Sequence, residues 1–208
     1  MIWWEGFINR FLIRLFDLLF SFLGLIILSP LYLIIALIVL IDSPGKIIYT
    51  QWRVGKNNRD FKLYKFRTMK INADKLGLIT VGMKDPRITR SGTFIRKYKL
   101  DELPQLLNVF NGQMSLVGPR PEVRQYTEQY SLANQMIVLS VKPGITDLAS
   151  IEYSKENELL SNVTDPEKYY VDVVMPAKIK LNLNFIENPT LSNYLRIIIM
   201  TINKLIRH

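Results

Sequence analysis

The stretch LLFSFLGLIILSPLYLIIALIVLI, residues 18–41, decides the fold. Its 24 residues carry no charge, and a helix of that length covers about 36 Å at ~1.5 Å per residue, enough for the ~30 Å core of a bilayer. Ser29-Pro30 lies near its middle. Proline removes one helical hydrogen bond and clashes with the preceding turn, and the serine hydroxyl can satisfy a carbonyl left free. The sequence therefore predicts a membrane helix broken at Ser29-Pro30.

The charges that flank this segment bear on its path through the bilayer. Arg10 and Arg14 precede it, and residues 42–100, which follow it, hold 15 basic and 4 acidic side chains. The positive-inside rule favours both flanks in the cytoplasm. A helix that enters and leaves by the same face satisfies this rule, whereas a kinked single span is the alternative that the charges leave open.

Two further stretches have the composition of helices that lie in a membrane surface. Residues 2–16, IWWEGFINRFLIRLF, mix Trp3, Trp4 and Phe7 with arginines, which is typical of an interfacial helix. Residues 191–208 place leucines and isoleucines at helical spacing, with basic side chains elsewhere around the helix. This second pattern is equally consistent with a packed core helix.

Composition limits the chemistry that is open to the chain. Its 208 residues suit one domain of ordinary size. There is no cysteine, and the single histidine is His208, the last residue, so disulfides, thiol nucleophiles, histidine-rich zinc sites and Ser-His-Asp catalysis are excluded. An enzyme with this composition works with carboxylates, hydroxyls, Lys, Arg, Tyr or an oxygen-bound metal such as Mg²⁺. The net charge of +9 suits phosphates as ligands, although a solvated basic face is the simpler alternative.

Two basic elements follow the apolar segment. Residues 46–69, KIIYTQWRVGKNNRDFKLYKFRTM, predict two short strands around a polar turn, and this hairpin carries Lys65. Residues 85–100, DPRITRSGTFIRKYKL, predict a turn followed by a basic helix that includes Arg96. A hairpin that meets phosphates is the more economical interpretation, and stacking on nucleic acid is the alternative.

The stretch KLDELPQLLNV, residues 99–109, contains two adjacent carboxylates, Asp101 and Glu102. The leucines that follow fit one helical face, Asp101 suits an N-cap and Pro104 is tolerated in the first turn. The same position has a chemical interpretation. A carboxylate at a helix N-terminus among cations stays charged, and it can act as a nucleophile or hold Mg²⁺.

The stretch SLVGPRPE places Arg120 between two prolines. Each proline restricts its own backbone and that of the residue before it, which lowers the cost of presenting the guanidinium to a phosphate or a base. An exposed arginine on a rigid loop is the simpler alternative.

Taken together, these motifs resemble the small monotopic phosphoglycosyl transferases, the bacterial sugar transferase family that initiates glycoconjugate assembly. The matching pieces occur in family order and cover nearly the whole chain. They are the Ser29-Pro30 break, FKLYKFRTM, the block DPRITRSGTFIRKYKLDELPQLLNVFNGQMSLVGPRPE, and KPGIT.

The resemblance implies transfer of a sugar 1-phosphate from a UDP-sugar to a membrane polyprenol phosphate such as undecaprenyl phosphate, with release of UMP. Asp101 would be the nucleophile that forms a covalent phosphosugar intermediate, with Mg²⁺ held there, and Glu102 would orient Asp101 or assist the polyprenol phosphate. Lys65 and Arg96 would contact phosphate, and Arg120 would lie near the nucleotide.

The fold implied is of the α+β class, mainly helical with a small β-hairpin. Residues 1–44 would form the re-entrant anchor, turned back at Ser29 and Pro30, and residues 45–208 the catalytic domain on the cytoplasmic face of the bacterial inner membrane. The expected partners are the two substrates and membrane lipid, with no nucleic acid. The oligomeric state, monomer or homodimer, stays open.

One departure from the family pattern concerns residues 147–158, DLASIEYSKENE. Many members continue the Pro-Gly-Ile-Thr turn with Gly-Leu-Trp-Gln, so the sugar is left in doubt. Two rival functions also stay open: a non-catalytic membrane adaptor that binds anionic lipid or a partner protein, and a membrane-tethered nucleic-acid binder. Neither rival needs the Asp101-Glu102 pair or a rigid Arg120.

Overall fold

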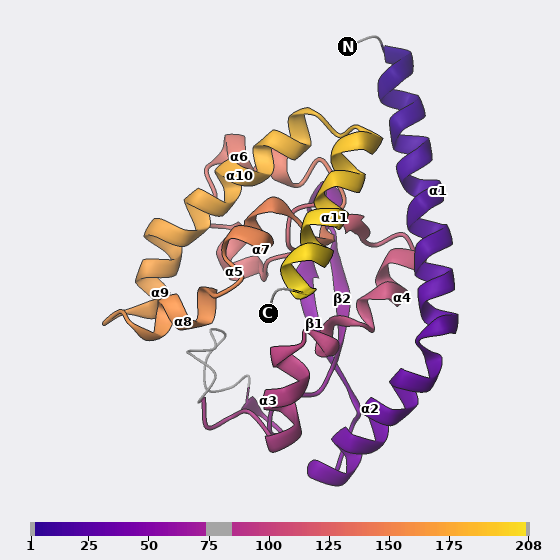
Figure 1. The fold of residues 1–208 in the computed structure, drawn as a ribbon. Coiled ribbons are helices and arrows are strands. Elements are labelled where there is room, and N and C mark those ends of the chain that lie inside the picture. Colours follow the sequence, from indigo (N-terminus) through magenta and orange to yellow (C-terminus); the bar gives the residue numbers. More distant parts are fainter. Residues whose placement is uncertain (1–2, 74–84, 207–208) are drawn as a thin grey trace.

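The computed structural model describes residues 3–73 and 85–206 and has the mainly helical fold with a small antiparallel hairpin that the sequence predicts (Figure 1). The strands are β1 (Ile48–Val54), β2 (Asp60–Phe66), β3 (Ser115–Val117) and β4 (Gly144–Thr146). The helices are α1 (Trp3–Ile27), α2 (Ser29–Asp42), α3 (Arg90–Lys97), α4 (Gln105–Phe110), α5 (Arg124–Thr127), α6 (Leu132–Val138), α7 (Leu148–Glu152), α8 (Glu156–Ser161), α9 (Pro166–Tyr169), α10 (Met175–Glu187) and α11 (Leu191–Ile206).

The predicted break at Ser29-Pro30 is confirmed. Pro30 lies in the first turn of α2, and the Ser29 hydroxyl donates to the carbonyl of Ile26 at 2.7 Å. The axes of α1 and α2 differ by 60°. Among the residues described, no single helix is long and apolar enough to cross a membrane, but the two helices of this bent pair together have the length and composition for it. The side chains of Trp3 and Trp4, and His208, lie outside the described residues.

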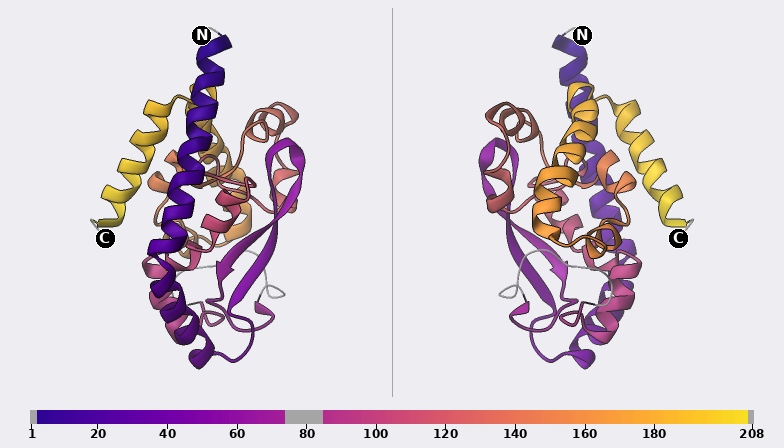
Figure 2. Two further views of the ribbon diagram at one scale, coloured as in Figure 1. Left: turned by 90° about the vertical axis from the view of Figure 1, so that its right-hand side faces the viewer. Right: turned by 90° about the vertical axis from the view of Figure 1, so that its left-hand side faces the viewer.

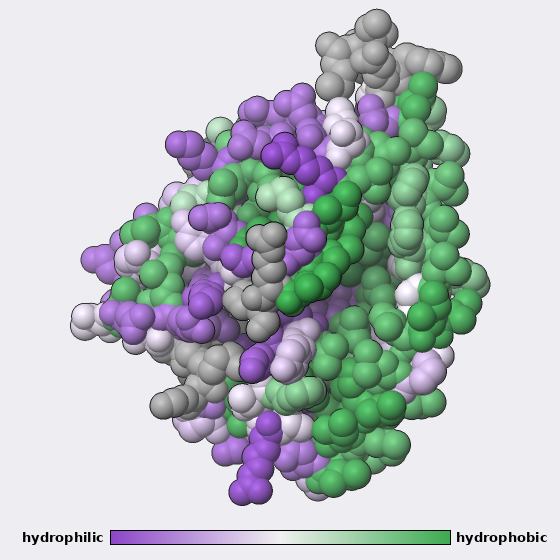
Figure 3. Space-filling view, viewed as in Figure 1, coloured by the Kyte–Doolittle hydropathy of each residue, from purple (hydrophilic) through white to green (hydrophobic). Residues whose placement is uncertain are grey.

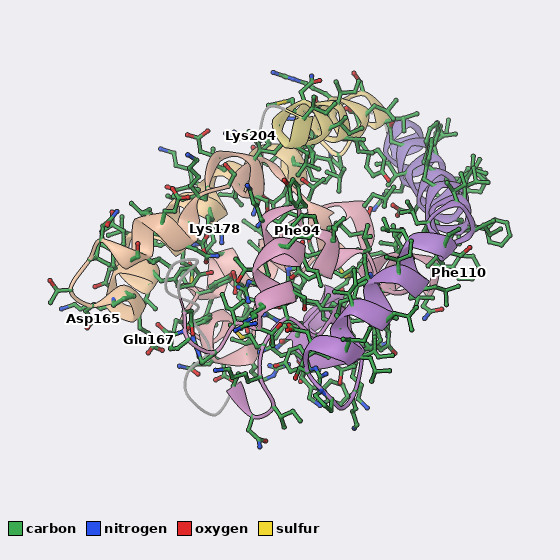
Figure 4. The ribbon with its side chains drawn as sticks, turned by 60° about the horizontal axis from the view of Figure 1, so that its bottom comes forward. Phe94, Phe110, Asp165, Glu167, Lys178 and Lys204 are labelled. Atoms are coloured by element: carbon green, nitrogen blue, oxygen red, sulfur yellow. The ribbon has the colours of Figure 1, made fainter. Side chains whose placement is uncertain are left out.

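The bent pair has a polar inner contact and an apolar outer face. Asp17, only 1% exposed, accepts hydrogen bonds from the hydroxyls of Ser115 and Tyr194 and from the backbone N–H of Leu116. The apolar residues gather along α1 and α2 and on α11 (Figure 3). Figure 4 shows Phe110 beside α1, on the opposite side of the molecule from α9. The large exposed apolar side chains of the pair include Phe7, Phe11, Leu15, Leu19, Phe22, Ile26, Ile27, Leu33, Ile34, Leu37 and Ile41.

The predicted hairpin is also confirmed. Strands β1 and β2 pair antiparallel from Ile48 opposite Phe66 to Val54 opposite Asp60. Phe61 and Leu63 are buried on the inner face, whereas Trp52 and Lys62 lie on the outer face with the ammonium 5.2 Å from the indole. Phe66, at the end of β2, lies on the other face and is buried against α2. When α1 faces the viewer, the hairpin and α11 flank it on either side (Figure 2).

Helix α11 confirms the predicted C-terminal helix, and one of its faces is packed in the core. Tyr194 and Ile197 are buried against α1 and β3, whereas Ile199, Ile202 and Leu205 are exposed. Membrane contact by that exposed face stays a prediction. The polar segment 152–172 contains the short helices α8 and α9; Asp165 caps α9, which is followed by a π-helical turn.

Two glycines allow the stretches SLVGPRPE and KPGIT to pack directly against each other. Strands β3 and β4 pair in parallel, and the backbones of Gly118 and Gly144 touch. A Cβ added at Gly144 would lie 2.1 Å from the backbone nitrogen of Gly118. The contact leaves no room for a side chain and places the loop that carries Arg120.

We expect Gly144→Ala to lower the free energy of unfolding by about 1–3 kcal/mol or more, because the obstructing atoms are backbone and cannot rotate away. Thermal denaturation of the detergent-solubilised protein measures it. Gly6→Ala is the matched control, since its Cβ meets only the Arg10 guanidinium at 3.8 Å, and a helical Gly→Ala change stabilises by about 0.5–1 kcal/mol. Equal melting temperatures for the two variants would contradict the tight contact.

Candidate active site

The five side chains for which the sequence predicts roles in catalysis or in phosphate and nucleotide binding line one cleft of about 1780 Å³. The hairpin supplies one wall, the turn at residues 98–103 another, and residues 150–160, from α7 to α8, a third. The cleft extends to Lys178 on α10 and to Lys204 on α11 (Figure 4). The residues brought together are Lys65, Arg96, Asp101, Glu102 and Arg120.

The two carboxylates lie on a turn of 3₁₀ helix, Leu100–Glu102, that precedes α4. Lys99 has a left-handed backbone, with φ 56°, and starts this turn. The predicted N-cap role of Asp101 is wrong, because neither the turn nor α4 has a side-chain cap. The N–H groups of Glu102 and Leu103 bond instead to the carbonyls of Lys99 and Leu100, at 3.2 and 3.3 Å. Backbone acceptors thus do the work that was assigned to the Asp101 side chain.

Glu102 is held by two cations. Its Oε1 accepts from the ammonium of Lys65 at 3.0 Å and from Nη2 of Arg120, and Nη1 of Arg120 lies 3.3 Å from Oε2. Burial alone would raise the pKa of Glu102, but the charges of Arg120 and Lys65 outweigh burial and hold this pKa well below its usual value. Glu102 therefore stays ionised and joins β2 to the loop that carries Arg120.

Asp101 is the uncommitted carboxylate of the pair. It is 7% exposed and makes no hydrogen bond or ion pair with any described residue. Burial raises the pKa of Asp101, and Glu102 raises it further, against the lowering effect of Lys65 and Arg96. Lys65 and Arg96 favour the charged form, as predicted, but burial and the charge of Glu102 outweigh them, so the net shift of the Asp101 pKa is opposite to the one expected. The lone pairs of Asp101 remain available to a ligand.

Arg120 is fixed at both its backbone and its guanidinium. Its N–H donates to the carboxylate of Asp147 at 2.7 Å, and Asp147, only 2% exposed, also caps α7 through the N–H of Ser150. Pairing with Glu102 raises the pKa of Arg120 above its ordinary value. Asp147 was not predicted to have this role. Its signal in the sequence is the Asp-x-x-Ser pattern of a helix start, which says nothing of Arg120.

Arg53 is a second residue that the sequence interpretation missed. Its guanidinium bonds to the side-chain oxygen of Gln51 at 2.6 and 3.1 Å and to the carbonyl of Pro121 at 3.0 Å, and it lines the same cleft. Gln51 and Arg53 alternate with the exposed Trp52 along β1, so the two-residue period could have placed them on the inner face. Arg96 also lines the cleft and forms no ion pair within the described part of the chain, so its charge is available to an anion.

Comparison with known protein families identifies the family of this chain. The model of the family described as "bacterial sugar transferase" matches residues 8–208. This chain belongs to that family. The predicted resemblance is confirmed.

Three relatives illustrate the similarity. A Bacillus subtilis (strain 168) protein, provisionally named as an undecaprenyl-phosphate N-acetylgalactosaminyl 1-phosphate transferase, is 48% identical over 117 residues, or 56% of this chain and 65% of the relative. The UDP-N-acetylgalactosamine-undecaprenyl-phosphate N-acetylgalactosaminephosphotransferase of Aeromonas hydrophila is 42% identical over 146 residues, or 69% of this chain and 34% of the relative. The UDP-glucose:undecaprenyl-phosphate glucose-1-phosphate transferase of Escherichia coli (strain K12) is also 42% identical over 146 residues, with 69% and 32% covered. The chain spans just under two thirds of the first relative and about a third of the other two.

Opposite stability effects are expected from neutralising the two carboxylates. Because the pKa of Asp101 is raised in the fold, ionisation of Asp101 costs stability as pH rises from the unfolded-state pKa of ~3.9 through the folded-state pKa. Because the pKa of Glu102 is lowered, the stability that Glu102 contributes is present above its unfolded-state pKa of ~4.3 and is lost as pH falls through the folded-state pKa.

At pH 7, Asp101→Asn is therefore expected to unfold at a higher temperature than the unsubstituted protein. Glu102→Gln should lose about 3–5 kcal/mol, because Lys65 and Arg120 are left without their partner in a buried site. Melting curves between pH 4 and 8 measure both effects. Destabilisation by Asp101→Asn comparable to that of Glu102→Gln would show that Asp101 has a structural partner after all.

Proposed function

We propose that this protein transfers a sugar 1-phosphate from a UDP-sugar to a polyprenyl phosphate such as undecaprenyl phosphate and releases UMP. The observation that carries the proposal is the uncommitted, buried Asp101 carboxylate beside cations that Glu102 holds in place. Family membership and the activities named for the three relatives support the same reaction. The relatives name two different sugars, so the sugar that this chain takes is left to experiment.

The cleft allows the transfer to proceed in two displacements. An oxygen of Asp101 attacks the phosphorus that bears the sugar, an aspartyl phosphosugar bond forms, and the bond to UMP breaks with its electron pair leaving on UMP. An oxygen of the polyprenyl phosphate then attacks the same phosphorus. The aspartyl bond breaks, Asp101 regains its charge, and a polyprenyl diphosphosugar leaves. Two steps through one nucleophile predict ping-pong kinetics.

The neighbouring side chains have complementary roles. Arg96 and Lys65 would bind the diphosphate, and Arg120 would lie on the nucleotide side of it. Glu102, ionised and held by two cations, keeps Lys65 and Arg120 at fixed positions, and it accepts hydrogen bonds rather than donating a proton. Cations that are already in place when the substrate arrives stabilise developing charge without reorganising.

The residues present fit a magnesium ion held jointly with substrate. The described residues contain no group of three His, Cys, Asp or Glu side chains that could bind a metal, but Mg²⁺ commonly uses one or two carboxylates together with substrate phosphates. Asp101 has the free oxygens for this, since those of Glu102 are engaged. When bound, Mg²⁺ would supply positive charge that neutralises the diphosphate.

The proposed setting is the cytoplasmic face of the bacterial inner membrane, with α1 and α2 entering and leaving by that face. The apolar outer surface of the pair and the 60° bend at Ser29-Pro30 support this path. Since one substrate is water-soluble and the other a lipid, a carboxylate held at the membrane surface could meet both. The division into a residue 1–44 anchor and a residue 45–208 catalytic domain follows from it.

The reaction is tested with detergent-purified protein, Mg²⁺, a panel of UDP-sugars and undecaprenyl phosphate, with UMP release as the readout. Without the lipid, one sugar should give a burst of about one UMP per protein. Asp101→Asn should lower turnover by roughly three orders of magnitude or more, whereas Asp172→Asn, on an exposed carboxylate outside the cleft, should not change it. No UMP release with any sugar would overturn the enzyme in favour of an adaptor, and full activity of Asp101→Asn would overturn the nucleophile alone.

The path of the anchor is tested with single cysteines in this cysteine-free chain. Arg10→Cys and Lys46→Cys replace exposed polar side chains on the two sides of the apolar segment. An impermeant thiol reagent should label both from the cytoplasmic side, in inverted vesicles and not in intact cells. Labelling from opposite sides would mean that the pair spans the bilayer.

A further inference from the structure

A tyrosine of the membrane helix α2 reaches the turn that carries the two carboxylates. The hydroxyl of Tyr32 donates to the carbonyl of Leu103 at 2.6 Å, and Leu103 directly follows Glu102. The same carbonyl accepts the N–H of Leu106 at 3.0 Å, so Tyr32 bonds to the point where the 3₁₀ turn passes into α4. Anchor and turn are thus joined by a direct hydrogen bond.

The ring of Tyr32 contacts β2, the strand that carries Lys65. Its centroid lies 5.5 Å from that of Phe66, the residue next to Lys65 on β2. Both Tyr32 and Leu103 pack around the buried cluster of Ile35, Val39, Phe66 and Ile95. One side chain therefore touches both of the segments that the Lys65–Glu102 pair joins.

The other helix of the pair holds the far end of α4. The guanidinium of Arg14 donates to the carbonyls of Val109 and Phe110, at 2.8 and 3.0 Å, and these are the last two residues of α4. A cation at the negative end of a helix is favourable. The ring of Phe22 stacks on that of Phe110, with centroids 6.1 Å apart. Segment 103–110 is thus held at its first carbonyl by α2 and at its last carbonyls by α1.

The ion pairs with Lys65 and Arg120 hold the Glu102 side chain, but the backbone of the turn beside Asp101 has few contacts of its own. The turn comprises three residues, closed by backbone hydrogen bonds of 3.2 and 3.3 Å, and Asp101 adds no hydrogen bond to it. A nucleophile needs its reacting atom within a few tenths of an ångström of the productive position, and a 1 Å displacement can cost about a hundredfold in rate. External contacts must supply that precision.

We infer that contacts from the broken helix pair fix the position of the turn that carries Asp101, and that Tyr32 and Arg14 are positioning residues for Asp101. The inference rests on the proposed function and deepens it: the membrane anchor forms part of the machinery that aims the nucleophile. The Tyr32 hydroxyl fixes the exit of the turn, its ring steadies the strand that carries Lys65, and Arg14 keeps α4 from sliding along α1.

The test compares Tyr32→Phe, which removes one hydroxyl and keeps the ring on Phe66, with Tyr169→Phe as a matched control. Tyr169 is partly buried on α9, outside the cleft, and its hydroxyl forms no hydrogen bond within the described residues. For Tyr32→Phe the single-turnover rate of UMP release from UDP-sugar should fall about tenfold. The KM for UDP-sugar should stay within about twofold, because Arg96 and Arg120 keep their places.

Amide hydrogen exchange over residues 100–110 measures, independently of catalysis, how well the helix pair orders this segment. Exchange should be at least about fivefold faster in Tyr32→Phe, and unchanged in Tyr169→Phe, because the carbonyl that orders the start of α4 loses a partner. Tyr32→Leu, which also removes the ring, should show a larger effect of the same kind. Arg14→Gln should accelerate exchange mainly at residues 109–112.

The outcomes separate this inference from the function on which it rests. No UMP release by the unsubstituted protein would overturn the proposed function. If the unsubstituted protein releases UMP and Tyr32→Phe equals it in burst rate and in amide exchange, the positioning role of Tyr32 would be overturned. A burst rate that falls only as far as the folded fraction falls, measured by the melting curve, would also overturn it, since Tyr32 would then serve folding and not position.

Discussion

The ion pairs of Glu102 with Lys65 and Arg120 are the contact on which the cleft depends. They join three segments distant in sequence: the hairpin, the 3₁₀ turn and the loop between two prolines. Buried charges are tolerated only when they are paired and hydrogen-bonded, so each segment needs the other two in place. Glu102 is paired with both cations whereas Asp101 forms no ion pair with any described residue, and two adjacent carboxylates thereby acquire different properties.

The position of Arg120 is set from a second side by contacts other than ion pairs. The Gly118–Gly144 contact brings the strand before this loop against β4, and Asp147, which follows β4, takes the backbone N–H of Arg120. Residues 147–158, where the chain departs from the family pattern, therefore begin with a structural aspartate and continue along the cleft wall through Ser150, Tyr153 and Glu156. The departure therefore lies on the wall of the cleft that is proposed to bind the sugar nucleotide.

Local patterns in the sequence were sufficient for the elements whose signals are local. The Ser29-Pro30 break, the hairpin and the basic helix each carry turn residues and periodicity in one short stretch, and all three form as predicted. The motifs also identified side chains that share a cleft. The role of Asp147 and the three-residue strands β3 and β4 escaped, because they are defined by partners far along the chain and three residues show no period. The capping role of Asp101 failed because the left-handed Lys99 starts a tighter turn than the helical pattern suggested.

The anchor is more than a tether because its inner face is polar. Asp17 lies on α1 with three hydrogen-bond donors, all from the body of the protein, and Arg14 is satisfied by carbonyls of α4. An ionisable side chain left facing hydrocarbon costs several kcal/mol, so α1 would be poorly stable in a membrane without the body docked on it. The same docking brings Tyr32 to the turn that carries Asp101. In the proposed membrane setting, packing of the helix pair on the body and placement of Asp101 are therefore parts of one cooperative arrangement.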